Sequence, residues 1–209
     1  LAVAVPVGVG MALAIDGHGR RGRWARRADI AMAALAGVPS VVYGVIGLAL
    51  FVRGLGIADM ARAGAATLVL LLVPAIANGT REALRVVPLS RREASLALGA
   101  TNWQTTWHRV LPDARSGLLA GLFAVVARAL GEASPLIVVG AALAATRTPD
   151  AVSPAAIPLP VLIFEWASSQ DAAWRAAALP AVLLLLALAL PASGLAVWLR
   201  DRDARRRSA

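Results

Sequence analysis

The sequence lacks lysine and cysteine entirely. The absence of cysteine excludes disulfides and thiolate metal sites, and two isolated histidines, His18 and His108, do not make a metal site. The absence of lysine excludes the P-loop motif, whose lysine contacts nucleotide phosphates. We therefore expect a chain that holds no metal or cofactor of its own, does not hydrolyse ATP and is not an enzyme.

Aromatic residues are also scarce, at 5%, and charged residues make up only 16%, whereas 59% of the 209 residues are apolar. Soluble domains contain about 45–50% apolar residues. Here the apolar residues form runs of about 20, the length that crosses a hydrocarbon core of ~30 Å as a helix. The composition predicts an all-α, polytopic membrane helix bundle.

Five apolar segments are predicted to be helical spans: residues 1–15, 30–52, 63–79, 117–145 and 174–199. The first begins at Leu1 without an initiator methionine, so we expect that an N-terminal part is missing. The spans are separated by a basic loop at 16–29, a turn at 53–62, a polar segment at 80–116 and a second long segment at 146–173.

All of the positive charge comes from arginine, and its distribution predicts the orientation of the chain. The first loop, the 80–116 segment and the C-terminal tail hold sixteen arginines, whereas the opposite side holds only Arg53, Arg62, Arg147 and Arg175. The positive-inside rule places the sixteen in the cytoplasm. Because the arginines lie between apolar runs rather than along one solvated face, a nucleic-acid surface is disfavoured.

The polar segment contains two predicted short helices joined at Gly99, a residue suited to a left-handed helix stop. Ser90 with Glu93 has the spacing of a capping box, as does Thr101 with Gln104. The second helix is expected to end at Pro112.

On that second helix, Trp103 and Trp107 are four residues apart and should share a face. A segment of this kind either projects into the cytoplasm or rests as an amphipathic helix on the lipid headgroups.

The same segment resembles the EAA loop of type I ABC importer permeases. Glu93-Ala94-Ser95, Gly99 and Leu111-Pro112 match the spacing of that motif, although Ser95 replaces its second alanine and Arg109 stands where an aliphatic residue is usual. The resemblance implies that residues 90–112 form the coupling helix, which docks into a groove on an ATPase subunit. Glu93 and Gly99 are expected to set its fit.

Four further stretches are similar to the PstA and PstC phosphate permeases, PstA more closely. They are GVPSVVYGVIGLALF from Gly37, TREALRVVP from Thr80, RALGEASPL from Arg128 and LPVLIFEWAS from Leu159. This similarity implies a six-span permease domain, of which residues 1–200 lack the first span, followed by a basic cytoplasmic tail at 201–209.

The resemblance also implies a setting in the bacterial plasma membrane and a set of partners. These are a PstC-like second permease, a homodimeric PstB-like ATPase that uses ATP and Mg, a periplasmic PstS-like phosphate-binding protein, and membrane lipid.

Arg128 and Glu132 are the charged residues predicted to lie within a span, where charges are costly and face protein or water. Their spacing of four predicts a shared helix face, so the two charges either have a structural role, in which they neutralise each other or a neighbouring helix, or serve function. In the functional interpretation, Arg128 offers planar donors to a translocating oxyanion and Glu132 partly neutralises it. The phosphate-permease resemblance favours the second interpretation.

Glycines and prolines within the spans predict local breaks or close packing. Pro135 leaves the Gly131 carbonyl without its helical partner, which predicts a kink that is either a hinge or only structural. Gly37, Pro39, Gly44 and Gly47 resemble a small-residue face, for which helix packing is favoured over substrate contact.

The proline-rich 149–174 segment is too interrupted to span and suits a re-entrant or gate-forming element. By resemblance it is a surface for the binding protein, with Glu165 and Trp166 as contact candidates.

Three rival functions remain. A permease for sulfate or molybdate shares the class, a proton-coupled carrier would use Arg128 and Glu132 as a relay, and a membrane scaffold would not transport. The charged pair disfavours the scaffold.

Overall fold

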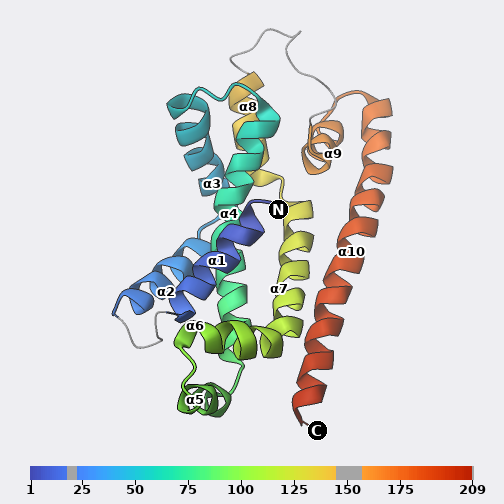
Figure 1. Ribbon diagram of the computed structural model, residues 1–209. Coiled ribbons are helices and arrows are strands. Elements are labelled where there is room, and N and C mark those ends of the chain that lie inside the picture. Colours follow the sequence, from blue (N-terminus) through green and yellow to red (C-terminus); the bar gives the residue numbers. More distant parts are fainter. Residues whose placement is uncertain (18–22, 145–156, 209) are drawn as a thin grey trace. The chain divides into compact units, whose positions relative to one another are not determined.

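The computed structural model describes residues 1–17, 23–144 and 157–208, and over these ranges it contains helices and no strand (Figure 1). The predicted all-α class is therefore confirmed. The chain divides into two compact units, which we describe separately. The first comprises residues 1–37, 72–126 and 192–209, and the second comprises residues 38–71 and 127–191.

The first unit contains most of the arginine-rich helix ends. It contains α1 (Ala4–Gly17), α2 (Arg23–Ala36), the second half of α4 (Met60–Arg85), α5 (Leu89–Ala97), α6 (Asn102–Thr105), the π-helical turn η2 (Thr106–Val110) and most of α7 (Leu111–Gly131). Its buried cluster is formed by Leu13, Leu84, Val87, Val110 and Ala114. Apolar side chains from α1, α4 and η2 thus meet beneath the short helix α5.

The second unit contains α3 (Ser40–Gly47), the π-helical turn η1 (Leu48–Gly54), the first half of α4, α8 (Ser134–Ala144), α9 (Leu159–Ala167) and α10 (Ala172–Ser208) as far as Pro191, the rest of α10 belonging to the first unit. Glycines lie at its helix contacts. A Cβ on Gly44 would lie 2.8 Å from the Pro135 Cα, and one on Gly64 would lie 2.9 Å from the Leu136 Cδ2. This close backbone approach is typical of membrane helix pairs.

Among the described residues, three helices are long and apolar enough to cross a membrane: Met60–Arg85, Asn102–Gly131 and Ala172–Arg202. They contain the predicted spans at 63–79 and 174–199 and part of that at 117–145. The bent pair Ala25–Ala36 and Ser40–Gly54 raises the number to four if it forms one span, and Ala4–Asp16 is a shorter apolar helix. These assignments rest on length and composition.

The predicted continuous span at 30–52 is wrong. The chain forms α2, then breaks at Gly37–Pro39, then continues as α3 and η1. Pro39 disfavours helical backbone at Val38, and its own extended backbone, with ψ of 137°, precedes α3. The packing prediction holds for Gly44 and Gly47, which are buried, but not for Gly37, which approaches no side chain within 4 Å.

The predicted span at 117–145 is also wrong in its bounds. Its helix begins at Asn102 and ends at Gly131, and a separate helix, α8, starts at Ser134. Pro135 stands in the first turn of α8, where a missing amide proton costs no helical bond. The residue predicted to kink one helix therefore starts another.

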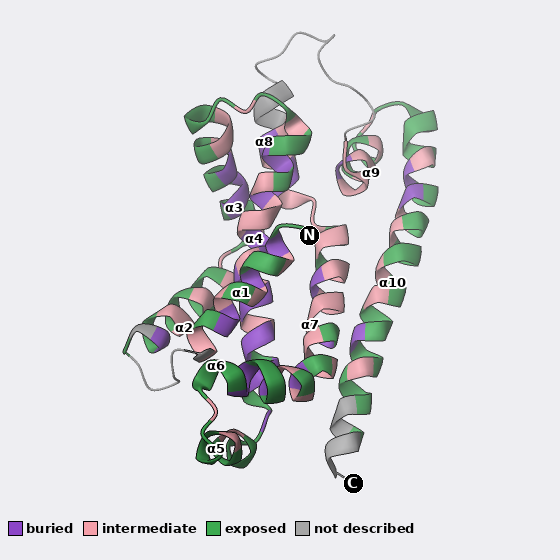
Figure 2. Cartoon of the chain, in the orientation of Figure 1, coloured by how far each residue is buried: buried purple, intermediate pink, exposed green. Residues whose placement is uncertain are grey.

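The predicted bounds of the basic loop and of the C-terminal tail also differ from the structure. Residues 23–29 of the predicted basic loop belong to α2, and α10 continues without a break into the basic tail as far as Ser208. Many large apolar residues of α10 are exposed in this chain, and Figure 2 shows the exposed and intermediate colours along most of this helix. Within the proline-rich segment, residues 149–156 lie outside the described ranges.

Candidate functional site

Arg128 occupies the last turn of α7 and its side chain is exposed. The prediction of a mid-helix position is therefore wrong, because the helix ends three residues later. A cation in this place interacts favourably with the negative end of the helix dipole and with the carbonyls that lack helical partners. The exposed guanidinium still presents a fork of donors that matches an oxyanion.

Glu132 follows the end of α7 and is half-buried. It does not share a helix face with Arg128, so the prediction from their spacing is wrong. Within the described ranges, no ion pair joins the two side chains. The structural interpretation, in which the two charges neutralise each other directly, loses its geometric basis.

Tyr43 is a neighbour of Arg128 that the sequence analysis did not single out. It is the chain's only tyrosine, is 3% exposed, and its hydroxyl interacts electrostatically with the Arg128 guanidinium. Gly44, the next residue of α3, packs against Pro135 at the start of α8. The break between α7 and α8 thus carries a cation and a carboxylate, and α3, the helix that contains Tyr43, packs against the start of α8. The signal for Tyr43 in the sequence was a single polar ring within an apolar run.

Four of the residues predicted as hinge or packing positions lie at the two helix breaks. Gly37 and Pro39 separate α2 from α3, and Gly131 and Pro135 flank the break after α7. Broken helices within a membrane are tolerated where the free backbone groups face protein or a water-filled cavity. Their role as hinges stays a prediction.

The 90–112 segment has the predicted bend at Gly99, whose φ of +88° is a left-handed value. The Thr101 hydroxyl accepts from the Gln104 amide and the Gln104 side chain accepts from the Thr101 amide, which confirms one capping box. The other is wrong, because α5 begins one residue before Ser90 and Pro88 is its N-cap.

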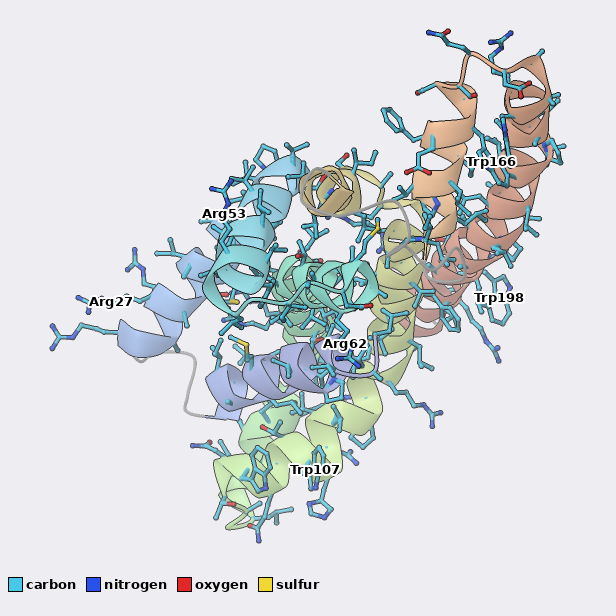
Figure 3. The ribbon with its side chains drawn as sticks, turned by 90° about the horizontal axis from the view of Figure 1, so that it is seen from above. Arg27, Arg53, Arg62, Trp107, Trp166 and Trp198 are labelled. Atoms are coloured by element: carbon cyan, nitrogen blue, oxygen red, sulfur yellow. The ribbon has the colours of Figure 1, made fainter. Side chains whose placement is uncertain are left out.

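Pro112 does not end the second helix, which is also a correction. The π-helical turn η2 immediately precedes it, and the Leu111 amide bonds to the Thr106 carbonyl five residues back. This wider turn accommodates the proline, so helix continues from Asn102 into α7. The rings of Trp103 and Trp107 stack with centroids 5.7 Å apart and are about half exposed, which confirms their shared face. Trp107 is labelled in Figure 3.

The EAA-like residues lie at the exposed surface of the segment. Glu93 and Ala94 are exposed, and Ser95 is half-buried because its hydroxyl bonds to that of Thr105 at 3.0 Å. A cavity of about 490 Å³ is lined by Ser90, Arg91, Ala94, Ser95, Leu98 and Arg109. Leu98 at its edge is 90% exposed. Arg109 therefore faces this cavity, where an aliphatic residue would add to its apolar wall.

Glu165 and Trp166 lie on the short helix α9. Glu165 is exposed, and the ring of Trp166, labelled in Figure 3, contacts that of Trp174 on α10, with centroids 5.7 Å apart. At nine residues, α9 is too short to span a bilayer, as predicted for this segment.

Comparison with protein families identifies the class. The model of the inner membrane component of binding-protein-dependent transport systems matches residues 4–204. The chain belongs to this family. It is therefore a multi-pass membrane permease with the type I ABC permease fold, and the resemblance carried by the EAA-like segment is confirmed.

Within this family, the relatives that this chain resembles include phosphate transport system permeases. The phosphate transport system permease protein PstA 1 of Mycobacterium tuberculosis is 38% identical over 136 residues, which cover 65% of this chain and 44% of that protein. PstA of Haemophilus influenzae is 32% identical over 88% of this chain and 66% of its own length. PstC of Xylella fastidiosa is 32% identical over 62% of this chain and 48% of its own. The chain thus spans about half to two thirds of these relatives.

Proposed function

We propose that this chain is a permease subunit of an ATP-driven importer and forms part of the translocation path for inorganic phosphate. The observation that carries the proposal is an exposed arginine at a break between apolar helices, in a chain whose relatives are phosphate permeases. Discontinuous membrane helices are a common way for transporters to bring backbone dipoles and charges to a substrate.

In this proposal, Arg128 binds the oxyanion with parallel N–H donors, and Glu132 weakens that binding enough for release. A permanent unopposed cation would hold phosphate too tightly, and conduction requires both entry and exit. The Tyr43 hydroxyl is held in the same region by the packing of α3 on α8. Gly131 and Pro135 provide the helix break at which the path opens.

The remaining subunits supply energy and substrate. A homodimeric PstB-like ATPase binds ATP and Mg and docks on the 90–112 segment, where Glu93 and Gly99 set the fit and Ala94, Ser95, Leu111 and Pro112 complete the motif. A PstC-like chain forms the other half of the path, and a PstS-like protein delivers phosphate at the α9 surface. The arginine distribution supports a cytoplasmic coupling segment and tail.

The proposal is tested by uptake of labelled phosphate into proteoliposomes that contain the full-length chain, its permease partner, the ATPase and the binding protein. Arg128→Gln should assemble normally and lose most uptake. The matched control is Arg62→Gln, which removes an exposed arginine from the first turn of α4. Normal uptake by the Arg128 variant would remove this residue from the path.

The same vesicles separate the rival functions. Uptake of sulfate or molybdate in preference to phosphate would assign another oxyanion. Uptake that continues without ATP and stops with an uncoupler would assign a proton-coupled carrier. If an assembled complex took up none of these anions, the remaining function would be that of a membrane scaffold that does not transport.

A further inference from the structure

Helix α5 is attached to the rest of the first unit mainly through polar contacts. None of its nine residues, all of which are described, is buried (Figure 2). Arg92 is its deepest anchor: Nη1 donates to the Asp16 carboxylate at 2.7 Å, and Nη2 donates to the Leu84 carbonyl at 2.8 Å. One guanidinium therefore joins α5 to the ends of α1 and α4.

The Arg92–Asp16 pair differs from the other ion pair of α5 in its burial. The side chains of Arg92 and Asp16 are only 12% and 6% exposed, whereas those of Arg91 and Asp113, 2.9 Å apart, are 55% and 25% exposed. A desolvated pair has strong mutual attraction, and breaking it by removal of one member is costly. A solvated pair is screened and contributes little.

Both members of the buried pair stand at an unfavourable end of their own helix. Asp16 is in the last turn of α1, near the negative end of its dipole, and Arg92 is in the first turn of α5, near the positive end. Neither residue is therefore placed to stabilise its own helix. Leu84 supplies one of the carbonyls at the end of α4 that lack a helical partner, and a nearby arginine is a suitable donor to it.

The elements that Arg92 joins are already packed together beneath it. Leu13, one turn before Asp16, shares a buried cluster with Leu84 and Val110. α1, α4 and η2 thus share one buried apolar cluster, and the Arg92 guanidinium connects α5 to two of these three elements. A close-packed cluster of this kind moves as a body rather than deforming.

We propose that Arg92 is a positioning residue that, with Asp16 and the Leu84 carbonyl, locks α5 to α1 and α4 so that movement of α5 reaches the membrane helices. The consequence for transport rests on the proposed function, in which α5 is part of the segment that an ATPase moves. Without the contacts of Arg92, α5 stays attached only through its exposed contacts. A force applied to α5 then moves it relative to α1 and α4 instead of moving the three helices together.

The first test measures phosphate uptake and ATP hydrolysis in the same proteoliposomes of the complete transporter. Arg92→Gln and Asp16→Asn should each assemble and hydrolyse ATP, and the phosphate taken up per ATP should fall about fivefold or more. Arg92→Lys keeps the charge opposite Asp16 and should restore part of the ratio. The matched control is Arg85→Gln, which removes an arginine that is 55% exposed and whose ion pair is with Asp29 on α2.

An unchanged ratio in an assembled Arg92→Gln complex overturns the proposal. So does an equal fall with Arg85→Gln, which would point to general loss of positive charge. If Arg92→Gln fails to assemble while Asp16→Asn assembles with normal coupling, the lock through Asp16 is likewise rejected.

The second test measures how firmly α5 is held to α1 and does not depend on transport. Because the chain has no cysteine, Val7→Cys on α1 and Leu96→Cys on α5, both exposed, accept spin labels before assembly with the partners. The distance distribution between the labels should be narrow in the otherwise native chain and broad with Arg92→Gln. An equally narrow distribution rejects the lock, whereas absence of phosphate uptake by the native complex rejects only the proposed function.

Discussion

Gly47 of α3 lies so close to Thr67 of α4 that a Cβ on the glycine would stand 2.7 Å from the Thr67 Cγ2. Thr67 is fully buried, and its hydroxyl donates to the Ala63 carbonyl at 2.8 Å within its own helix. The hydroxyl is thereby satisfied without a partner on α3. Close approach of the two backbones, rather than a hydrogen bond between the helices, holds this contact.

Gly47→Ala should therefore destabilise the fold by about 1–3 kcal/mol, the usual cost of overpacking. Thermal unfolding in detergent measures the effect. Gly194→Ala on α10, where no described atom lies within 4 Å of the new Cβ, should be neutral or slightly stabilising. The double variant Gly47→Ala with Thr67→Ala should recover part of the loss, and failure to do so would place the strain elsewhere.

Gly99→Ala should weaken the bend between α5 and α6. The positive φ costs an L-residue roughly 1–2 kcal/mol, although the added Cβ would meet no described atom within 4 Å. Gly99→Asn should cost less, because asparagine tolerates the left-handed region. Binding of the purified ATPase to the permease complex measures the result, with Gly10→Ala, a substitution within the helix α1, as control. Equal binding by the three variants would show that the bend does not set the docking geometry.

Thr101→Ala should destabilise the start of α6 by about 1 kcal/mol, because it removes a formed capping box. Ser90→Ala should have little effect, since Ser90 lies inside α5 and caps nothing in its first turn. Hydrogen exchange of the amides at the start of each helix distinguishes the two variants. A larger change from Ser90→Ala would contradict the helix start at Leu89.

Asp29→Asn should be strongly destabilising. Asp29 on α2 pairs with both Arg81 and Arg85 of α4, and the Arg81 side chain is only 10% exposed. Loss of the carboxylate breaks its ion pair with the buried Arg81 guanidinium, and breaking a buried pair costs about 3–5 kcal/mol. Arg85→Gln should cost at most about 1 kcal/mol, because Asp29 keeps its buried partner and Arg85 is well solvated. Similar unfolding temperatures for both variants would contradict this difference.

Much of the candidate site was predictable, but its geometry was not. The EAA-like motif, the Gly99 turn and the Thr101 cap depend on residues within one or two turns of each other, so the sequence predicts them directly. The predicted shared face of Arg128 and Glu132 was wrong because it assumed a helix that continues to Ala145. Pro135 marked the break, but a proline in a membrane helix is compatible with a kink or with a new start.

The sequence by itself determined the membrane class, most of the helical segments, the turn at Gly99 and the family. Each follows from composition, run length or backbone preference, which are local properties. Only the tertiary structure placed Arg92 against Asp16, 76 residues away, Asp29 against Arg81, and Tyr43 beside Arg128. Apolar membrane helices can pack through many faces, so the pairing of their charged residues depends on contacts among all the helices together.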